Sequence, residues 1–138
     1  MREPIISSTA NPGEFIATGA TLAIQEWQGS APGELHVHHS DDIAWHVISG
    51  TLQFRFAEGR VARLSPGETL FLPAGTPHTY GEGDTARYLV IGPPRVFELF
   101  AELRNARISR SHTDWGNGPD REIYRAYDAE LLEWPGQS

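Results

Sequence analysis

Histidines gather in one short stretch of the sequence, Gly33 to Gly50, which reads GELHVHHSDDIAWHVISG. His36 and His38 are two residues apart there, and on a β-strand this spacing puts both imidazoles on the same face. A third histidine, His78, follows a predicted strand and a Pro-Gly turn further along the chain. If its strand packs beside that of His38, three neutral imidazoles converge on one divalent ion and leave positions open for water, substrate or oxygen.

The spacing alone leaves two interpretations of these histidines open. A His-x-His pair also occurs on strands by chance, and a single histidine after a turn is often a hydrogen-bonded loop residue. The chain has no cysteine, so a metal site would have to use nitrogen and oxygen ligands. On this basis the metal-binding and the structural interpretation have equal weight.

The segments around the histidines are typical of a β-rich domain. Extended segments are expected at residues 21–28, 34–39, 43–50, 51–57, 60–67, 68–75 and 86–94. Turns are predicted at residues 29–33 and 58–59, and a loop at residues 76–84. Short strands with frequent turns, in a chain rich in glycine and proline, predict an all-β sandwich or barrel of the jelly-roll kind.

The pattern changes to helical after the last predicted strand. Pro93 and Pro94 end that strand, and Pro94 suits the first turn of a helix. Apolar residues at helical spacing follow at Val96, Phe97, Phe100 and Leu103. After a loop at residues 109–120, residues 121–136 predict a second helix with Ile123, Tyr127 and Leu131 on one side, changing to an extended tail near Glu130.

Composition and length limit the organisation and the partners. We expect one domain over residues 1–138, with an irregular arm up to about residue 15, a barrel at about 15–92 and a helical extension at about 94–134. A net charge of -7 argues against nucleic acid and against an anionic membrane surface as partners. The N-terminus lacks the apolar run of a signal peptide and no segment is apolar for long enough to span a membrane, so a cytoplasmic location is expected.

Two motifs in the right order resemble those of the cupin superfamily. Residues 67–78, GETLFLPAGTPH, match the second motif (Gly, five residues, Pro-x-Gly, two residues, His, three residues, Asn) at every fixed position up to the histidine, and Glu82 stands at the position of the asparagine. The first motif is a glycine, His-x-His, a glutamate and a closing glycine; Gly50 closes it, with His36 and His38 at the expected distances before it. The resemblance covers residues 30–92, and the C-terminal part is similar to small quercetinase-like cupins. It implies a double-stranded β-helix, the jelly-roll barrel, with one or two C-terminal helices.

The first motif departs from the family at its glutamate, whose position holds Ile43. Asp42 fits a shorter spacing, but if Trp45 and Val47 face inward with position 43, Asp42 points outward. A β-bulge would turn it inward. We predict His36, His38 and His78 as the metal ligands and Asp42 as a turn residue, with a ligand role for Asp42 as the weaker alternative. His39, His46 and His112 are not expected to bind the metal.

The resemblance implies one divalent transition metal ion, and nitrogen ligands suit Fe, Mn, Ni, Cu, Co or Zn. In quercetinase-like cupins the glutamate binds the metal and accepts the substrate's proton, so Ile43 removes the obvious base. Three-histidine cupins that activate oxygen occur among the thiol and diketone dioxygenases. We therefore predict a metal-dependent enzyme of the dioxygenase type that acts on a small organic substrate. The alternatives are a non-catalytic binding or sensing cupin, or a lyase or isomerase that uses His78 or Tyr80 as acid or base.

Apolar and aromatic residues are expected to surround this site. The predicted substrate-binding wall consists of Trp45, Val47, Phe54, Phe56 and Tyr80, with Tyr88 as a further candidate. For each of them, filling the core of a small barrel is the alternative role. A homodimer is expected from the family, because exposed edge strands of such barrels are often paired.

Overall fold

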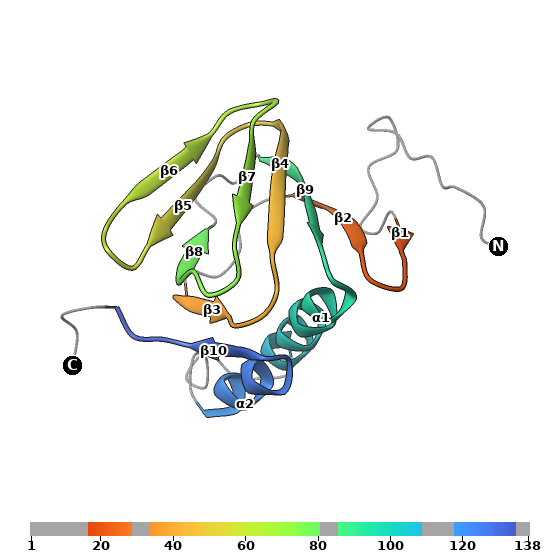
Figure 1. Ribbon diagram of the computed structural model, residues 1–138, viewed down its shortest axis with the longest axis vertical. Coiled ribbons are helices and arrows are strands. Elements are labelled where there is room, and N and C mark those ends of the chain that lie inside the picture. The colour runs from red at the N-terminus through yellow and green to blue at the C-terminus, as the bar shows by residue number, and fades with distance from the viewer. Residues whose placement is uncertain (1–16, 29–33, 81–85, 109–117, 135–138) are drawn as a thin grey trace.

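Two antiparallel sheets face each other in the computed structural model, which describes residues 17–28, 34–80, 86–108 and 118–134. Figure 1 shows the sheets with two helices beside one end of them. The elements are β1 (Ala17–Thr18), β2 (Ala23–Gln28), β3 (His36–His38), β4 (Ile43–Ser49), β5 (Leu52–Phe56), β6 (Val61–Leu64), β7 (Thr69–Leu72), β8 (His78–Tyr80), β9 (Arg87–Gly92), α1 (Pro94–Ile108), α2 (Gly118–Ala126) and β10 (Ala129–Leu131). The predicted N-terminal arm, the turn at residues 29–33 and His112 lie outside the described residues.

The strand order confirms the jelly-roll prediction. The first sheet has the order β1-β2-β9-β4-β7 and the second has the order β10-β3-β8-β5-β6. Strands far apart in the sequence are therefore neighbours in both sheets, as when β9 lies between β2 and β4. This arrangement brings the two histidine-containing segments, β3 and β8, side by side.

Alternation along β4 determines which residues reach the space between the sheets. Ile43, Trp45 and Val47 are buried, whereas Ala44 and His46 lie on the opposite face. The inward parity predicted for this strand is confirmed. Side chains from both sheets meet in one apolar core, which includes Trp45, Val47, Leu52, Phe54, Phe56, Leu64, Leu72, Tyr80, Tyr88 and Val90.

The predicted loop at residues 76–84 is wrong at residues 78–80. Residues 78–80 form β8, which pairs with β3 through His36↔His78 and with β5 through Phe56↔His78. The strand has only three residues and follows the turn-forming sequence Pro-Ala-Gly-Thr-Pro, so local preferences favour a loop. The two neighbouring strands supply the pairing that makes it extended.

The C-terminal segment packs as predicted at its start and differs at its end. Helix α1 begins at Pro94, and Val96, Phe97 and Leu103 are buried, with Phe100 partly buried. Helix α2 begins at Gly118, inside the predicted loop at residues 109–120. The extended tail is β10, an edge strand of the second sheet beside β3. Neither described helix is long and apolar enough to cross a membrane.

Candidate metal centre

Three histidines from two adjacent strands converge between the sheet and the C-terminal helices. His36 and His38 come from β3 and His78 from β8, and one ring nitrogen of each lies within 4.8 Å of the others. The ring centroids of His36 and His78 are 4.4 Å apart, and those of His36 and His38 are 5.0 Å apart. Their exposed fractions are 6%, 2% and 0%. We call this group the histidine cluster.

Backbone carbonyl groups fix the protonation of two of the rings. Nδ1 of His36 lies 3.0 Å from the carbonyl oxygen of Glu34, and Nδ1 of His78 lies 2.9 Å from that of Thr76. A carbonyl oxygen only accepts, so each Nδ1 donates its hydrogen, and in the neutral ring Nε2 carries the lone pair. This is the hydrogen-bonding pattern that orients metal-binding histidines in proteins.

His38 lacks this kind of support. Neither of its ring nitrogens has a hydrogen-bond partner among the residues that the structure describes, and Nε2 of the buried His78 has none there either. A buried polar atom without a partner costs on the order of 1–3 kcal/mol. A cation bound between the rings would accept these lone pairs, so the histidine cluster fits a divalent transition metal.

Burial keeps His38 and His78 uncharged. It is the main cause that lowers the pKa of His38 from 6.5 to about 3, and nearby positive charges act in the same direction. Burial also lowers the pKa of His78 well below its ordinary value. Both rings are therefore neutral at neutral pH, which is the state that binds metals.

Asp42 does not belong to the histidine cluster. Its side chain is exposed and its Oδ1 accepts a hydrogen bond of 2.8 Å from the backbone N–H of Ala74. Ile43 takes the inward position of the family glutamate and is 1% exposed. The structure thus places Asp42 at the turn before β4 and the Ile43 side chain in the interior, as the strand parity predicts.

Two aromatic residues of the C-terminal helices lie against the histidine cluster. The Phe100 ring of α1 is 6.4 Å from the His38 ring, and the Tyr124 ring of α2 is 5.3 Å from the His36 ring. The Tyr124 hydroxyl donates to the Glu34 carboxylate at 3.4 Å. The helical stripe predicted Phe100 as a packing residue only. No pattern in the sequence indicated that Tyr124 contacts the site, because the predicted helix had Ile123 and Tyr127 on its packed side.

A group of charges joins the helices to the turn that follows β3. The guanidinium of Arg95, at the start of α1, donates twice to the buried carboxylate of Asp41, at 2.7 and 2.9 Å. It also lies 3.4 Å from Asp128, a residue with a φ of 58° in the turn between α2 and β10. The hydrogen bonds that Arg95 donates to Asp41 raise the pKa of Arg95 above its ordinary value. Arg95 therefore ties the strand that carries His36 and His38 to the segment that covers them.

A family model described as the cupin domain matches residues 23–92, about half of the chain. The chain belongs to the cupin family. Among solved structures, the polyketide cyclase RemF from Streptomyces resistomycificus is 26% identical over 54% of this cupin and 56% of its own chain, with a TM-score of 0.47. KdgF from Halomonas sp. is 24% identical over 67% of this cupin and 94% of its own chain, with a TM-score of 0.50. The likeness to KdgF supports the fold, and the match to RemF spans just over half of that protein. No curated protein matches the sequence.

The residues predicted to form a substrate-binding wall lie in the apolar core of the cupin. Trp45, Val47, Phe54, Phe56 and Tyr80 are all at most 6% exposed. Trp45 contacts Phe54 and Tyr80, with ring centroids 5.0 and 5.3 Å apart, and its ring lies 5.8 Å from that of His78. Burial raises the pKa of Tyr80 to about 12. Contact with a substrate stays a prediction for these residues.

The other described histidines of the cupin lie outside the cluster. His46 is on the outer face of β4, where its Nδ1 is 2.7 Å from the Thr69 hydroxyl. His39 is exposed, with its Nε2 3.5 Å from the Glu130 carboxylate. These positions match the expectation that neither side chain belongs to a metal site.

Proposed function

We propose that this cupin is a metal-dependent enzyme of the dioxygenase type that acts on a small organic substrate. One divalent transition metal ion would be held by His36, His38 and His78, and nitrogen ligands suit Fe, Mn, Ni, Cu, Co and Zn. The observation that carries the proposal is the convergence of three buried imidazoles, two of them oriented by backbone carbonyl groups. When bound, the metal would supply Lewis-acid chemistry and open positions for substrate and oxygen.

The surrounding residues suit an apolar or aromatic substrate that carries an anionic oxygen or sulfur. Three neutral ligands leave the full double positive charge of the ion to be balanced by the substrate. Phe100 and the Tyr124 ring give the histidine cluster apolar neighbours, and such surroundings exclude water and strengthen electrostatic attraction. The Tyr124 hydroxyl, held by Glu34, is a polar group at the edge of these surroundings. These features favour enolates, thiolates and phenolates as ligands.

A non-catalytic binding or sensing cupin is the second candidate. It is favoured by Ile43, because a buried hydrocarbon side chain takes the place of the family's proton acceptor. A lyase or isomerase that uses Tyr80 as a base has less support, because Tyr80 lies in the core and stays protonated at neutral pH with its pKa of about 12. A cytoplasmic location and a small-molecule partner remain predictions from the sequence.

Oxygen uptake by the metal-loaded full chain tests the proposal. Small diketones, thiols and phenols are offered to wild-type protein, to His38→Ala and to His46→Ala, which changes a histidine on the outer face of β4. We expect uptake with at least one class in wild type and His46→Ala, and its loss in His38→Ala. If a compound raises the melting temperature of the wild type and no oxygen is consumed, the binding function replaces the enzyme.

A further inference from the structure

The nitrogen atoms that would bind a metal are shut off from solvent in this structure. Nε2 of His36, His38 and His78 is buried in each ring, and the exposed fractions of the three side chains are 6%, 2% and 0%. Tyr124 of α2 covers the His36 ring, with ring centroids 5.3 Å apart. Phe100 of α1 lies against the His38 ring. A metal ion or a substrate therefore reaches the histidine cluster only after a part of the chain moves.

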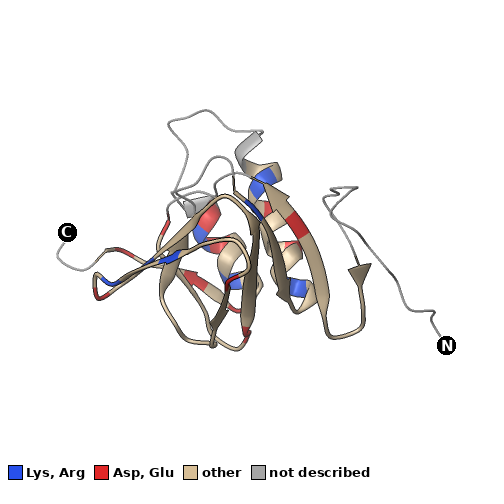
Figure 2. Ribbon diagram, turned by 90° about the horizontal axis from the view of Figure 1, so that it is seen from above, with Lys and Arg blue, Asp and Glu red and all other residues tan. Residues whose placement is uncertain are grey.

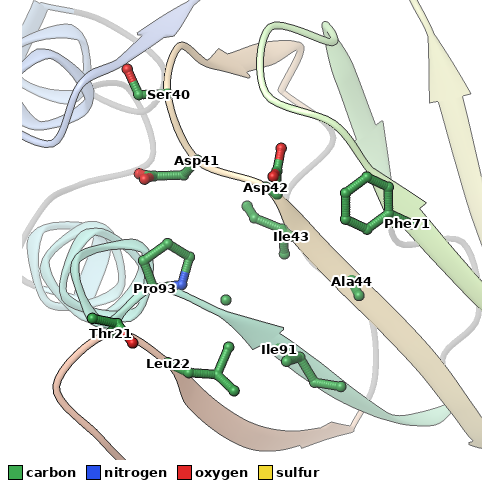
Figure 3. A pocket seen from close by; sticks show the side chains of 11 residues that line it. Thr21, Leu22, Ser40, Asp41, Asp42, Ile43, Ala44, Phe71, Ile91 and Pro93 are labelled. Atoms are coloured by element: carbon green, nitrogen blue, oxygen red, sulfur yellow. The ribbon is translucent and has the colours of Figure 1, made fainter.

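Helix α1 is fastened to the barrel at its first turn. Val96 and Phe97 of this helix belong to the main apolar core between the sheets. Arg95 donates two hydrogen bonds to the buried Asp41 in the turn that follows β3. Asp41 and Pro93, the residue before α1, line one pocket, and Figure 3 shows them on the same side of it. These contacts keep α1 in place on the barrel.

Helix α2 and strand β10 are held in a different way, through a second and smaller apolar cluster. Only α1, α2 and β10 contribute buried residues to it, namely Leu99, Leu103, Tyr124, Ala129 and Leu131. Figure 2 shows charged residues along the helices, whereas most of the strand ribbon is uncharged. Segments with few buried apolar side chains open at a lower free energy than the core does. The segment of α2 and β10 can therefore open while the barrel stays folded.

We propose that residues 118–131, which comprise α2, β10 and the turn between them, form a cover that opens to give access to the histidine cluster. Opening lifts Tyr124 from the His36 ring and exposes the edge of β3, while α1 and the core stay in place. Arg95 of α1 also lies 3.4 Å from Asp128 in that turn, so it helps to hold the cover shut. The role of the cover rests on the proposed function, but its opening is a property of the metal-free chain, so the two inferences can fail separately.

A disulfide can lock β10 to β3, because the chain has no cysteine of its own. Val37 of β3 and Glu130 of β10 are paired across the two antiparallel strands, and such pairs are close enough for a disulfide. Successive side chains alternate between the faces of a strand, so Val37 lies on the opposite face from His36 and His38. The double variant Val37→Cys/Glu130→Cys is therefore locked when oxidised and unlocked when reduced, and each form is the control for the other.

Two leucine substitutions weaken the cover and the barrel separately. Leu131 of β10 is 7% exposed and belongs to the smaller apolar cluster, whereas Leu64 of β6 is 6% exposed and belongs to the main core. Both lose the same atoms when alanine replaces leucine. Leu131→Ala weakens the packing of the cover, and Leu64→Ala weakens the barrel instead. The pair therefore separates opening of the cover from unfolding of the whole chain.

Modification of the histidines of the metal-free full chain by diethyl pyrocarbonate at neutral pH tests the proposal, with peptide mass spectrometry as the readout. We expect the histidine cluster to react at least about tenfold more slowly in the oxidised double variant than in the reduced one. In Leu131→Ala it should react at least about tenfold faster than in the wild type or in Leu64→Ala. His46, on the outer face of β4, should react at the same rate in all of them.

The proposal is overturned if the oxidised and reduced forms react at the same rate, or if Leu64→Ala accelerates the reaction as much as Leu131→Ala does. It is also overturned if the histidine cluster of the wild type reacts as fast as His46, because the site is then open without any movement. If Leu131→Ala does not fold, the two forms of the double variant decide. A wild type that binds no metal would overturn the proposed function instead, without changing these rates.

Discussion

Two neighbouring regions fill the interior of this cupin with opposite chemistry. In the aromatic cluster, Trp45, Phe54 and Tyr80 pack with ring centroids 5.0 to 5.3 Å apart. In the histidine cluster, three imidazoles pack about as closely. Unlike hydrocarbon side chains, these rings bring polar nitrogen atoms into the interior. Both regions are almost fully buried.

The aromatic cluster contributes stability, whereas the histidine cluster is kept for function. Buried aromatic side chains stabilise the fold through their area and their ring contacts. Buried imidazoles with incomplete hydrogen bonding lower the stability of the metal-free chain, so their presence needs another explanation. Metal binding supplies one.

Replacing one side chain in each region gives the largest contrast. Phe54→Ala leaves a cavity in the core, and we expect the free energy of unfolding to fall by about 3–5 kcal/mol. Leucine has a volume similar to that of histidine, and His38→Leu removes two buried ring nitrogens. We therefore expect the free energy of unfolding of the metal-free variant to be at most about 1.5 kcal/mol lower than that of the metal-free wild type, or higher. Urea unfolding measures both, and equal losses would contradict the contrast.

Acid is expected to destabilise the histidine cluster selectively. His38 takes up a proton near pH 6.5 in the unfolded chain but only near pH 3 in the folded one, so its contribution is full above pH 6.5 and is lost as the pH falls towards 3. As the pH falls between these two values, each such histidine lowers the free energy of unfolding by about 1.4 kcal/mol for every pH unit.

Urea midpoints of metal-free protein at several pH values measure this slope. The free energy of unfolding of His38→Leu should depend less steeply on pH than that of the wild type, because one buried histidine is missing. The pH dependence of Phe54→Ala should be the same as that of the wild type. Parallel curves for wild type and His38→Leu would show that His38 is not neutral and buried in the folded state.

The charged connection at Arg95 should have an intermediate effect. Arg95→Gln removes both hydrogen bonds to the buried Asp41, and we expect a loss of about 1–2 kcal/mol, since the guanidinium is itself half-exposed and partly screened. The control is Arg60→Gln, which breaks an exposed pair with Glu58 and should cost less than about 0.5 kcal/mol. Unfolding by urea compares them; equal losses would mean that Arg95 does not fasten α1 to the β3–β4 turn.

The smallest effect is expected at Asp42. Asp42→Ala removes the hydrogen bond to Ala74 and should lower the free energy of unfolding by about 0.5–1.5 kcal/mol. Metal content should not change, because Asp42 lies outside the histidine cluster. A variant that loses its metal would restore the alternative in which Asp42 is a ligand.

Local sequence patterns predicted the parts of the site that depend on strand phase. The two-residue spacing placed His36 and His38 on one face, and the parity of β4 placed Ile43 inside and Asp42 outside. Strand β8 was not predicted, because long-range pairing with β3 and β5 decides its conformation. For β10 the sequence predicted an extended tail near Glu130, but not its pairing with β3. The contact of Tyr124 with His36 depends on the same packing, so no spacing in the sequence could indicate it.

Elemental analysis shows whether His36, His38 and His78 hold a metal ion. The full chain is purified without a histidine tag and without chelator, as wild type, His78→Ala and the outer-face control His46→Ala. We expect about one equivalent of a divalent transition metal in wild type and His46→Ala, and almost none in His78→Ala. A His78→Ala variant that keeps its metal, or a wild type that takes up none even on reconstitution, would contradict the three-histidine site.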